Sequence, residues 1–242
     1  MTHHWLITGA GSGIGAATAA AAVGQGDTVL ALDIDETAGS HLADQTGATF
    51  QRFDVSDFEQ WRSLCDGLAA QNIPDRVHLN AGIQLAPPEA PLADYRLEAM
   101  TLTRYRRMLG VNVDGVVFAL HHLAPILPAG SAVVVTASLA GITPYSIDPL
   151  YAMSKHAVVG LVRSLAPTLA KRQIRINALC PGGIDTNIIP HEQRTPDADF
   201  MSPSAVADEV LRLMETPQSG QAWAKVSASK AAFAVRLPGE RR

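Results

Sequence analysis

The sequence contains few of the residues that mark several classes of protein. Cysteine occurs only twice in 242 residues, as Cys65 and Cys180, without CxxC spacing, so neither a disulfide framework nor a zinc site is indicated. Both are expected to be buried free thiols. The eight histidines form no HxxxH or HExxH pattern, and we expect no metal site. Charged residues make up 17% of the chain and the net charge is −4, which disfavours nucleic-acid binding and a polybasic membrane anchor.

Long hydrophobic runs are missing as well. Residues 5–26 carry no charged side chain, but six glycines interrupt them and no Lys or Arg precedes them, so they fit neither a signal peptide nor a membrane span. Hydrophobic residues nevertheless make up 47% of the chain, which excludes disorder. We expect a single cytoplasmic domain over residues 1–242 that does not associate with membranes.

Short apolar runs alternate with longer helical stretches throughout the chain. Most of the runs are continuously apolar, which is typical of parallel strands covered on both faces. The expected strands are Trp5–Thr8, Thr28–Asp33, Thr49–Phe53, Arg76–Leu79, Ala132–Ala137, Ile174–Leu179 and Ala222–Val226. The expected helices are Ile14–Gly24, Glu36–Thr46, Phe58–Gln71, Thr103–Leu123, Tyr151–Ala170 and Ser204–Thr216.

This alternation predicts an α/β fold, a Rossmann-type, doubly wound, seven-stranded and mostly parallel sheet with helices on both faces. Loops near 84–91, 139–149 and 187–203 follow predicted strands. We expect them to rim the carboxyl edge of the sheet, where ligands bind in such folds.

The first expected strand ends in the glycine-rich stretch TGAGSGIG (8–15), and an alanine-rich helix follows. Glycines let the backbone turn tightly and approach a pyrophosphate, which then faces the N–H groups of the helix's first turn. A flexible turn has the same composition, but the strand before and the helix after favour a dinucleotide site. The residues expected to bind this cofactor are Gly9, Ser12, Gly13, Ile14 and Gly15.

Asp33 ends the second expected strand, 18 residues after Gly15. A carboxylate there can hold both hydroxyls of an adenosine ribose and would repel a 2′-phosphate, so the sequence predicts NAD as the cofactor. The alternative is an Asp that caps the next helix, a role better suited to Asp35.

Two further strand ends carry residues suited to a nucleotide. Asp54 can accept from an adenine amino group and Val55 can offer its N–H, although a strand-end turn explains Asp54 nearly as well. Asn80, Ala81 and Gly82 follow the fourth strand, where small residues let the backbone pass close to a cofactor and Asn80 can tie neighbouring strands; an ordinary turn is the alternative.

Tyr151 and Lys155 are four residues apart and so lie on one helical face. Ser138 follows an apolar strand, 13 residues before Tyr151. A YxxxK pattern alone usually means a surface helix. Combined with the glycine motif, Asp33 and a strand-end serine, it indicates a catalytic group.

Together these motifs resemble the compact, single-domain branch of the short-chain dehydrogenase/reductase family. The resemblance spans about residues 5–215 and also rests on Asn112 in VNVDG and on PGGIDT (181–186). It implies that Tyr151 is the general acid/base, that Lys155 stabilises the Tyr151 anion and holds the nicotinamide ribose, and that Ser138 binds the substrate oxygen.

The resemblance assigns further roles around these groups. It implies that Asn112 positions a water connecting Lys155 to solvent, although a helical Asn needs some polar partner in any case. Pro181 and Gly182 would pack on the nicotinamide, whereas Ile184 and Thr186 would bind its carboxamide; the alternative is an ordinary Pro-Gly turn. His78, inside an expected strand, is interpreted as a hydrogen-bonded core histidine.

The sequence therefore predicts NAD(H)-dependent oxidoreduction between a secondary alcohol and a ketone, both small molecules. The alternatives are an NADPH-dependent carbonyl reductase and a non-catalytic cofactor-sensing or scaffold protein. The resemblance also implies a homodimer or homotetramer through helices Thr103–Leu123 and Tyr151–Ala170, with Val158, Val159, Leu161 and Leu165 as candidate interface residues.

Overall fold

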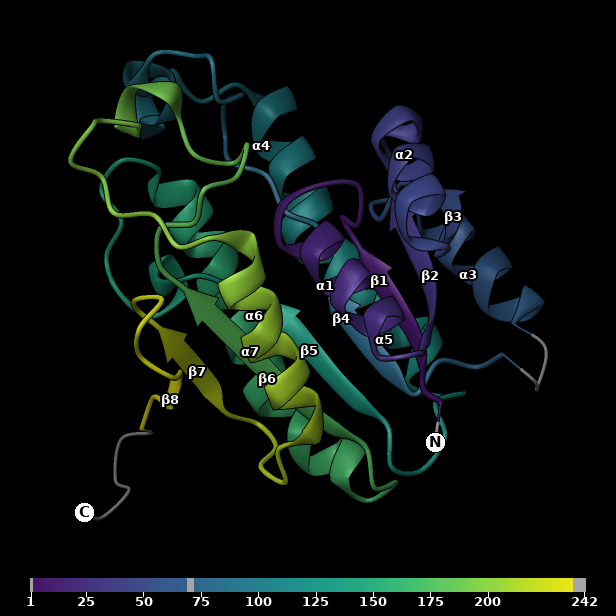
Figure 1. The fold of residues 1–242 in the computed structure, drawn as a ribbon. Helices are drawn as coiled ribbons and strands as arrows, with labels where there is room; N and C mark the ends of the chain where they lie inside the picture. The colour runs from purple at the N-terminus through teal and green to yellow at the C-terminus, as the bar shows by residue number, and fades with distance from the viewer. Residues whose placement is uncertain (1, 69–71, 237–242) are drawn as a thin grey trace.

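The computed structural model describes residues 2–68 and 72–236. Within them, one sheet has the strand order β3-β2-β1-β4-β5-β6-β7-β8 (Figure 1). The strands are β1 His4–Thr8, β2 Thr28–Asp33, β3 Thr49–Arg52, β4 Arg76–Leu79, β5 Ala132–Thr136, β6 Arg175–Pro181, β7 Ala222–Lys225 and β8 Phe233–Ala234. β1 to β7 pair in parallel, and β8 pairs with β7 antiparallel.

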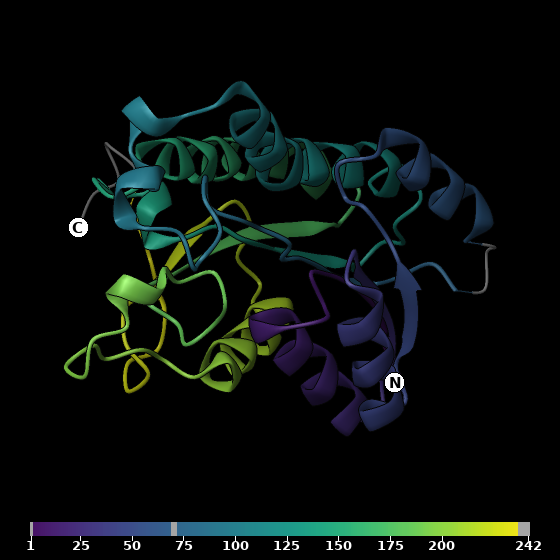
Figure 2. The ribbon, with the colours of Figure 1, turned by 90° about the horizontal axis from the view of Figure 1, so that it is seen from above.

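The helices form one layer on each face of this sheet. The helices are α1 Gly13–Gly24, α2 Glu36–Thr46, α3 Phe58–Gly67, α4 Leu102–Leu109, α5 Gly115–Leu123, α6 Pro149–Ala170 and α7 Pro203–Glu215. Figure 2 shows α3 to α6 on one side of the sheet and α1, α2 and α7 on the other. The doubly wound α/β prediction is confirmed, and the sheet has one short strand more than the seven expected.

Alternating strand residues build two separate apolar cores. In β1, Leu6 packs with Val77 and Val135 beneath α3, α5 and α6. Trp5 and Ile7 point to the opposite face, toward α1 and α7. β1, β2, β5, β6 and β7 contribute side chains to both cores, so their residues are apolar on both faces, which explains the continuously apolar runs.

The predicted helix over Thr103–Leu123 is divided by a π-helical turn at Gly110–Asp114. A Cβ on Gly110 would lie 3.2 Å from Cβ of Ser56, so the helix lies very close to the loop after β3 at this point. Such π turns are frequent at functional sites. The helix predicted to reach Gln71 ends at Gly67 in the described part, and residues 69–71 lie outside it.

The loops that follow the parallel strands gather above the carboxyl edge of the sheet (Figure 1). They contain short 3₁₀ turns at Leu92–Tyr95, Leu97–Ala99, Leu139–Gly141 and His191–Gln193. Residues of the loops near 84–91, 139–149 and 187–203 line one common cleft, as the sequence predicted. The fold therefore brings three distant stretches of chain to one edge.

Candidate active site

A cleft of about 900 Å³ opens at the carboxyl ends of the parallel strands. The predicted site residues that line it are Gly9, Ser12, Gly13, Ile14, Asp33, Asp54, Val55, Asn80, Ala81, Gly82, Ser138, Tyr151, Lys155, Pro181, Gly182, Ile184 and Thr186. The other two, Gly15 and Asn112, support the lining from behind, against Gly9 and Ile83 respectively. The fold thus brings every predicted site residue into one place.

The glycine-rich stretch forms a tight cradle at the start of α1. Gly9 and Gly13 have φ angles of 63° and 53°, in the left-handed region that favours glycine. A Cβ on Gly15 would lie 2.1 Å from the carbonyl oxygen of Gly9, so no other residue fits there. Ser12 precedes the helix without a side-chain cap, which leaves the N–H groups of the first turn free to bind an anion.

Asp33 lies half-buried at the end of β2 and closes one side of this cradle. Its Oδ2 accepts from the Gly11 N–H at 2.8 Å, and its Oδ1 accepts from the Asp35 N–H at 2.9 Å. The cap of α2 is Asp35, whose Oδ1 accepts from the Ala38 N–H. The capping alternative for Asp33 is therefore wrong.

The other strand ends are held by short hydrogen bonds. Oδ1 of Asp54 accepts from the N–H and the hydroxyl of Ser56, at 2.9 and 2.7 Å, so Asp54 does form a strand-end turn. Asn80 ties β4 to β1, as predicted. Its N–H donates to the Thr8 hydroxyl at 2.9 Å, and its Nδ2 donates to the Gly9 carbonyl at 3.2 Å.

Tyr151 and Lys155 lie one turn apart on α6, and both side chains are almost completely buried. The Lys155 ammonium is 5.6 Å from the centre of the Tyr151 ring and donates to the Thr136 carbonyl at 3.0 Å. Burial lowers the pKa of Lys155 to about 8. Burial also raises the pKa of Tyr151, and the neighbouring Ser138 side chain acts in the opposite direction. Ser138, Tyr151 and Lys155 therefore lie together in one part of the cleft.

Asn112 lies in the π-helical turn, fully buried and with its amide occupied by protein groups. Its Nδ2 donates to the Ile83 carbonyl at 2.8 Å and to the Ser154 hydroxyl at 3.0 Å, and its Oδ1 accepts from the Ile83 N–H at 2.8 Å. A Cβ on Gly82 would lie 3.1 Å from the Lys155 ammonium and 3.4 Å from the Asn112 oxygen. Gly82 thus keeps a narrow space between these two groups.

The loop after β6 reaches back across the start of α1. Gly182 donates its N–H to the Lys225 carbonyl at 2.9 Å, and Ile184 forms a bridge with Met201. A Cβ on Gly13 would meet the Thr186 methyl group at 2.9 Å. Residues 181–186 are therefore fixed over the glycine cradle, on the side opposite Asp33 in the strand order.

Asp148 is a residue of this site that the sequence analysis missed. It is completely buried, and its two carboxylate oxygens accept from the N–H of Tyr151 and the N–H of Leu85, each at 2.8 Å. It thereby caps α6 and fastens a substrate-side loop to the helix that carries Tyr151. Burial raises the pKa of Asp148, and backbone hydrogen bonds oppose that effect. Asp148 followed by Pro149 is the usual start of a helix and could have revealed it.

Several other expectations concern single residues. His78 is fully buried and its Nε2 lies 2.8 Å from the Thr136 hydroxyl, which confirms a hydrogen-bonded core histidine. Both cysteines are free; Cys180 is buried, but Cys65 is only half-buried, contrary to prediction. In the described ranges no group of three or more His, Cys, Asp or Glu side chains could hold a metal ion. None of the described helices is long and apolar enough to cross a membrane.

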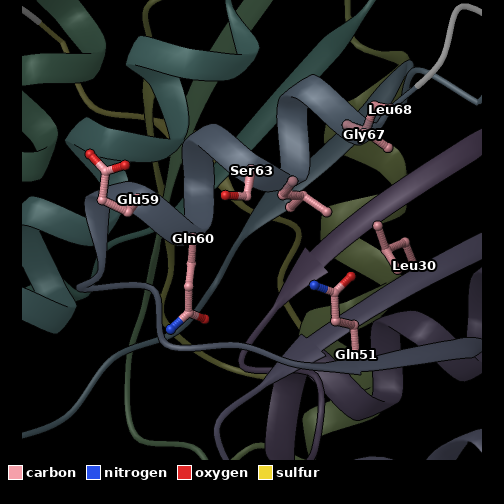
Figure 3. Close-up of a pocket in the computed structure, with 8 residues that line it drawn as sticks. Leu30, Gln51, Glu59, Gln60, Ser63, Gly67 and Leu68 are labelled. Carbon is pink, nitrogen blue, oxygen red and sulfur yellow. The ribbon is translucent and has the colours of Figure 1, made fainter.

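A second hollow, of about 490 Å³, lies between β2, β3 and α3 (Figure 3). It is lined mainly by Leu30, Gln51, Gln60 and Ser63, and its one acidic lining residue, Glu59, is paired with Arg62. None of the predicted site residues lies there. We assign it no chemistry.

Comparisons with known proteins agree with this geometry. A family model described as short chain dehydrogenase matches residues 3–197. The chain belongs to the short-chain dehydrogenase family. It is 34% identical over 200 residues to a 2,5-dichloro-2,5-cyclohexadiene-1,4-diol dehydrogenase of Sphingobium indicum, covering 80% of this chain and 76% of the relative. It is 32% identical to a cis-4-hydroxycyclohexanecarboxylate dehydrogenase of Sinomonas cyclohexanicum, covering 95% and 91% of the two chains.

Solved structures of short-chain dehydrogenases share the fold over nearly the whole chain. A short chain dehydrogenase from Burkholderia cenocepacia in complex with NADP has a TM-score of 0.81 at 25% identity, covering 94% of this chain and 98% of the other. A 3-oxoacyl-[acyl-carrier protein] reductase from Brucella melitensis with bound NAD has a TM-score of 0.79 at 30% identity, covering 93% and 90%. Membership of this family makes the protein an oxidoreductase that interconverts secondary alcohols and ketones.

Proposed function

We propose that this short-chain dehydrogenase oxidises a ring-borne secondary alcohol with NAD, using Tyr151 as the base. The observation that carries the proposal is the placement of Tyr151, Lys155 and Ser138 in the same cleft as the glycine cradle and Asp33. The cofactor would accept a hydride from the alcohol carbon. The chain itself must bind and orient both molecules and move the hydroxyl proton.

The residues of the cradle fit a dinucleotide. The first-turn N–H groups of α1 would hold the pyrophosphate, because Ser12 leaves them free and Gly15 keeps the backbone close. Asp54 and Val55 would border the adenine, and Asn80, Ala81 and Gly82 would border the middle of the cofactor. The loop with Pro181, Gly182, Ile184 and Thr186 would cover the nicotinamide.

Asp33 supports NAD over NADP. Its carboxylate lies in the cleft at the end of β2, already oriented by the Gly11 and Asp35 N–H groups. Residues 9–15 and 33–38 contain no Lys or Arg that could neutralise a 2′-phosphate. A negative charge fixed beside the ribose would therefore favour free hydroxyls.

The proton would move through Tyr151. Ser138 would donate to the substrate oxygen where negative charge develops, and the Tyr151 oxygen would take the hydroxyl proton. Lys155 lies close enough to stabilise the phenolate electrostatically. We further propose that a water held beside Asn112 connects Lys155 to solvent.

The substrate side of the cleft supports an apolar ring. Leu85, Leu139, Ala140 and Ile188 line it, and none of them carries a charge. The names of the two relatives above also describe alcohols on six-membered carbon rings. Cyclohexanol is therefore a suitable first probe.

We also propose a cytoplasmic homodimer or homotetramer formed through α4, α5 and α6. Leu102, Val117 and Met153 on these helices are 55%, 39% and 43% exposed, which is high for large apolar side chains. Val158 and Val159, expected from the sequence to face a partner, are buried in the chain's own core instead. Light scattering at micromolar concentration should show at least twice the chain mass of 25.6 kDa; a monomer would refute this assembly.

The direct test of the proposed function is NADH formation from cyclohexanol, followed by absorbance, with NAD and NADP compared at equal concentration. We expect turnover with NAD and a much lower kcat/KM with NADP. Equal kcat/KM with both cofactors would show that Asp33 does not select NAD over NADP. An absence of turnover on every secondary alcohol, with NADH still bound, would favour the cofactor-sensing alternative.

A further inference from the structure

Three polar side chains from different loops lie on the substrate side of the cleft, beside apolar lining residues such as Leu85, Ala140 and Ile188. They are Gln84 from the loop after β4, Tyr145 from the loop before α6, and Gln193 from the loop after β6, and all three line the cleft. The Tyr145 ring centre is 6.1 Å from that of Tyr151, with the two rings at 68°. The polar cluster of Gln84, Tyr145 and Gln193 is therefore next to Tyr151, the proposed base.

Gln84 holds an unused hydrogen-bond acceptor. The side chain is only 7% exposed, and its Nε2 donates to the Ile188 carbonyl at 2.8 Å. Its Oε1 has no partner among the residues that the structure describes. A buried amide oxygen without a donor is unfavourable, so a ligand hydroxyl at this point would satisfy it.

Tyr145 holds a matching donor. Gln193 Nε2 donates to the Tyr145 oxygen at 3.2 Å, and the return contact to Gln193 Oε1 is long, at 3.4 Å. Burial raises the pKa of Tyr145, and its hydrogen bond with Gln193 only partly opposes this. The phenol thus keeps its proton near neutral pH and can donate it to a ligand.

We propose that the substrate carries a second hydroxyl group, which donates to Gln84 Oε1 and accepts from the Tyr145 hydroxyl. This rests on the proposed function and narrows the substrate class to diols on a small apolar ring. A ketone or ether oxygen at the same point could only accept, and would leave Gln84 unpaired. A carboxylate would find no cation among Gln84, Tyr145 and Gln193, because the arginines that line the cleft, Arg104 and Arg107, lie on α4. It would also lie near the buried Asp148, whose charge reaches Tyr145.

The substrate test compares cyclohexanol, the 1,2-, 1,3- and 1,4-cyclohexanediols in cis and trans forms, and the monomethyl ether of the best diol, all with NAD. We expect one diol to exceed cyclohexanol in kcat/KM by about tenfold, since a buried acceptor gains its partner. The monomethyl ether, which cannot donate to Gln84, should lose that advantage. Equal kcat/KM for cyclohexanol and every diol would overturn the proposal.

The variants Tyr145→Phe and Gln84→Met test the two contacts separately. Each should lower the ratio of kcat/KM for the best diol over that for cyclohexanol by about tenfold. Tyr105→Phe is the matched control, because Tyr105 lies on α4 outside the cleft lining and should leave the ratio unchanged. Equal losses for diol and cyclohexanol would mean that the cluster only ties the three loops together, and would also overturn the proposal.

A binding readout separates this inference from the proposed function. The thermal shift produced by each diol is measured in the presence of NADH, for the wild type and for Tyr145→Phe. A shift with a diol that cyclohexanol does not give, and that Tyr145→Phe loses, supports the second-hydroxyl site even if no alcohol is oxidised. Without any such shift or any diol preference in turnover, the proposal is wrong.

Discussion

Asp148 connects α6, the helix that carries Tyr151, to the loop that carries Leu85, and its removal should have effects that can be separated. In Asp148→Ala, α6 loses its cap, worth about 1 kcal/mol. The same change leaves the buried Leu85 N–H without its charged acceptor, worth about 2 kcal/mol. The free energy of unfolding should therefore fall by about 3 kcal/mol in total.

Asp148→Ser distinguishes the two contributions. Serine caps helices as well as aspartate does, but its shorter side chain would not also reach the Leu85 N–H. We expect a loss of about 2 kcal/mol in urea unfolding, with a KM that rises more than kcat falls, because loop 83–86 loses its anchor. The matched control is Asp57→Ala, which removes the cap of α3 outside the cleft and should change stability without changing KM.

Asp148 also acts on Tyr151 through its charge. That charge raises the pKa of Tyr151, so both Asp148 variants should move the rising limb of kcat/KM for alcohol oxidation to lower pH. Reduced stability with an unchanged pH profile and an unchanged KM would show that Asp148 only caps the helix. Wild-type stability in Asp148→Ser would refute the role of the Leu85 contact.

Three further predictions concern the cofactor cradle and the base. Asp33→Ser should lower the preference for NAD, measured as the ratio of kcat/KM with NAD to kcat/KM with NADP. A unit charge pair at ~4 Å and an effective dielectric of ~20 is worth about 4 kcal/mol before screening, so we expect a wild-type preference of roughly two to three decades. An unchanged ratio in Asp33→Ser would contradict the assignment of Asp33. Gly15→Ala should abolish NADH binding in a fluorescence titration, because its Cβ would overlap the Gly9 carbonyl. Gly24→Ala is the control and should bind NADH normally, because no atom lies within 4 Å of its Cβ. Equal binding by the two variants would contradict the role of the glycine cradle in cofactor binding. In wild type, kcat/KM for alcohol oxidation should rise with pH as Tyr151 ionises. Lys155→Met removes the charge that stabilises the phenolate and should move that rise to higher pH; an unmoved rise would contradict this role of Lys155.

Much of the fold could be predicted because its signals are local. The bounds of β1 to β7 agree with those expected from the sequence to within two residues. Most of these strands are covered on both faces and are therefore continuously apolar, which makes them visible in the sequence. β8 could not be predicted, because two residues, Phe233 and Ala234, carry no periodicity. The π-helical turn depends on the packing of Gly110 against Ser56, which are 54 positions apart in the sequence.

The residues of the candidate site also fall into those with a local sequence signal and those that only folding brings together. Tyr151 and Lys155 have a fixed spacing, and Asp33 has a fixed place at a strand end, so the sequence identifies them. Gln84, Tyr145 and Gln193 come from three loops, and only the folded chain shows that they meet. Asp148 had a local signal, the Asp-Pro helix start, but its second contact with Leu85 spans 63 positions and has no sequence pattern.

In the proposed reaction Tyr151 takes the proton of the alcohol hydroxyl during oxidation. Tyr151→Phe keeps the ring, which packs with Leu85, Met108 and Ala140, and removes only the ionisable oxygen. The decisive measurement is the single-turnover rate of NADH formation by this variant, beside its NADH affinity from fluorescence titration. We expect unchanged NADH affinity with a rate reduced by at least about a hundredfold. A near-wild-type rate would contradict it.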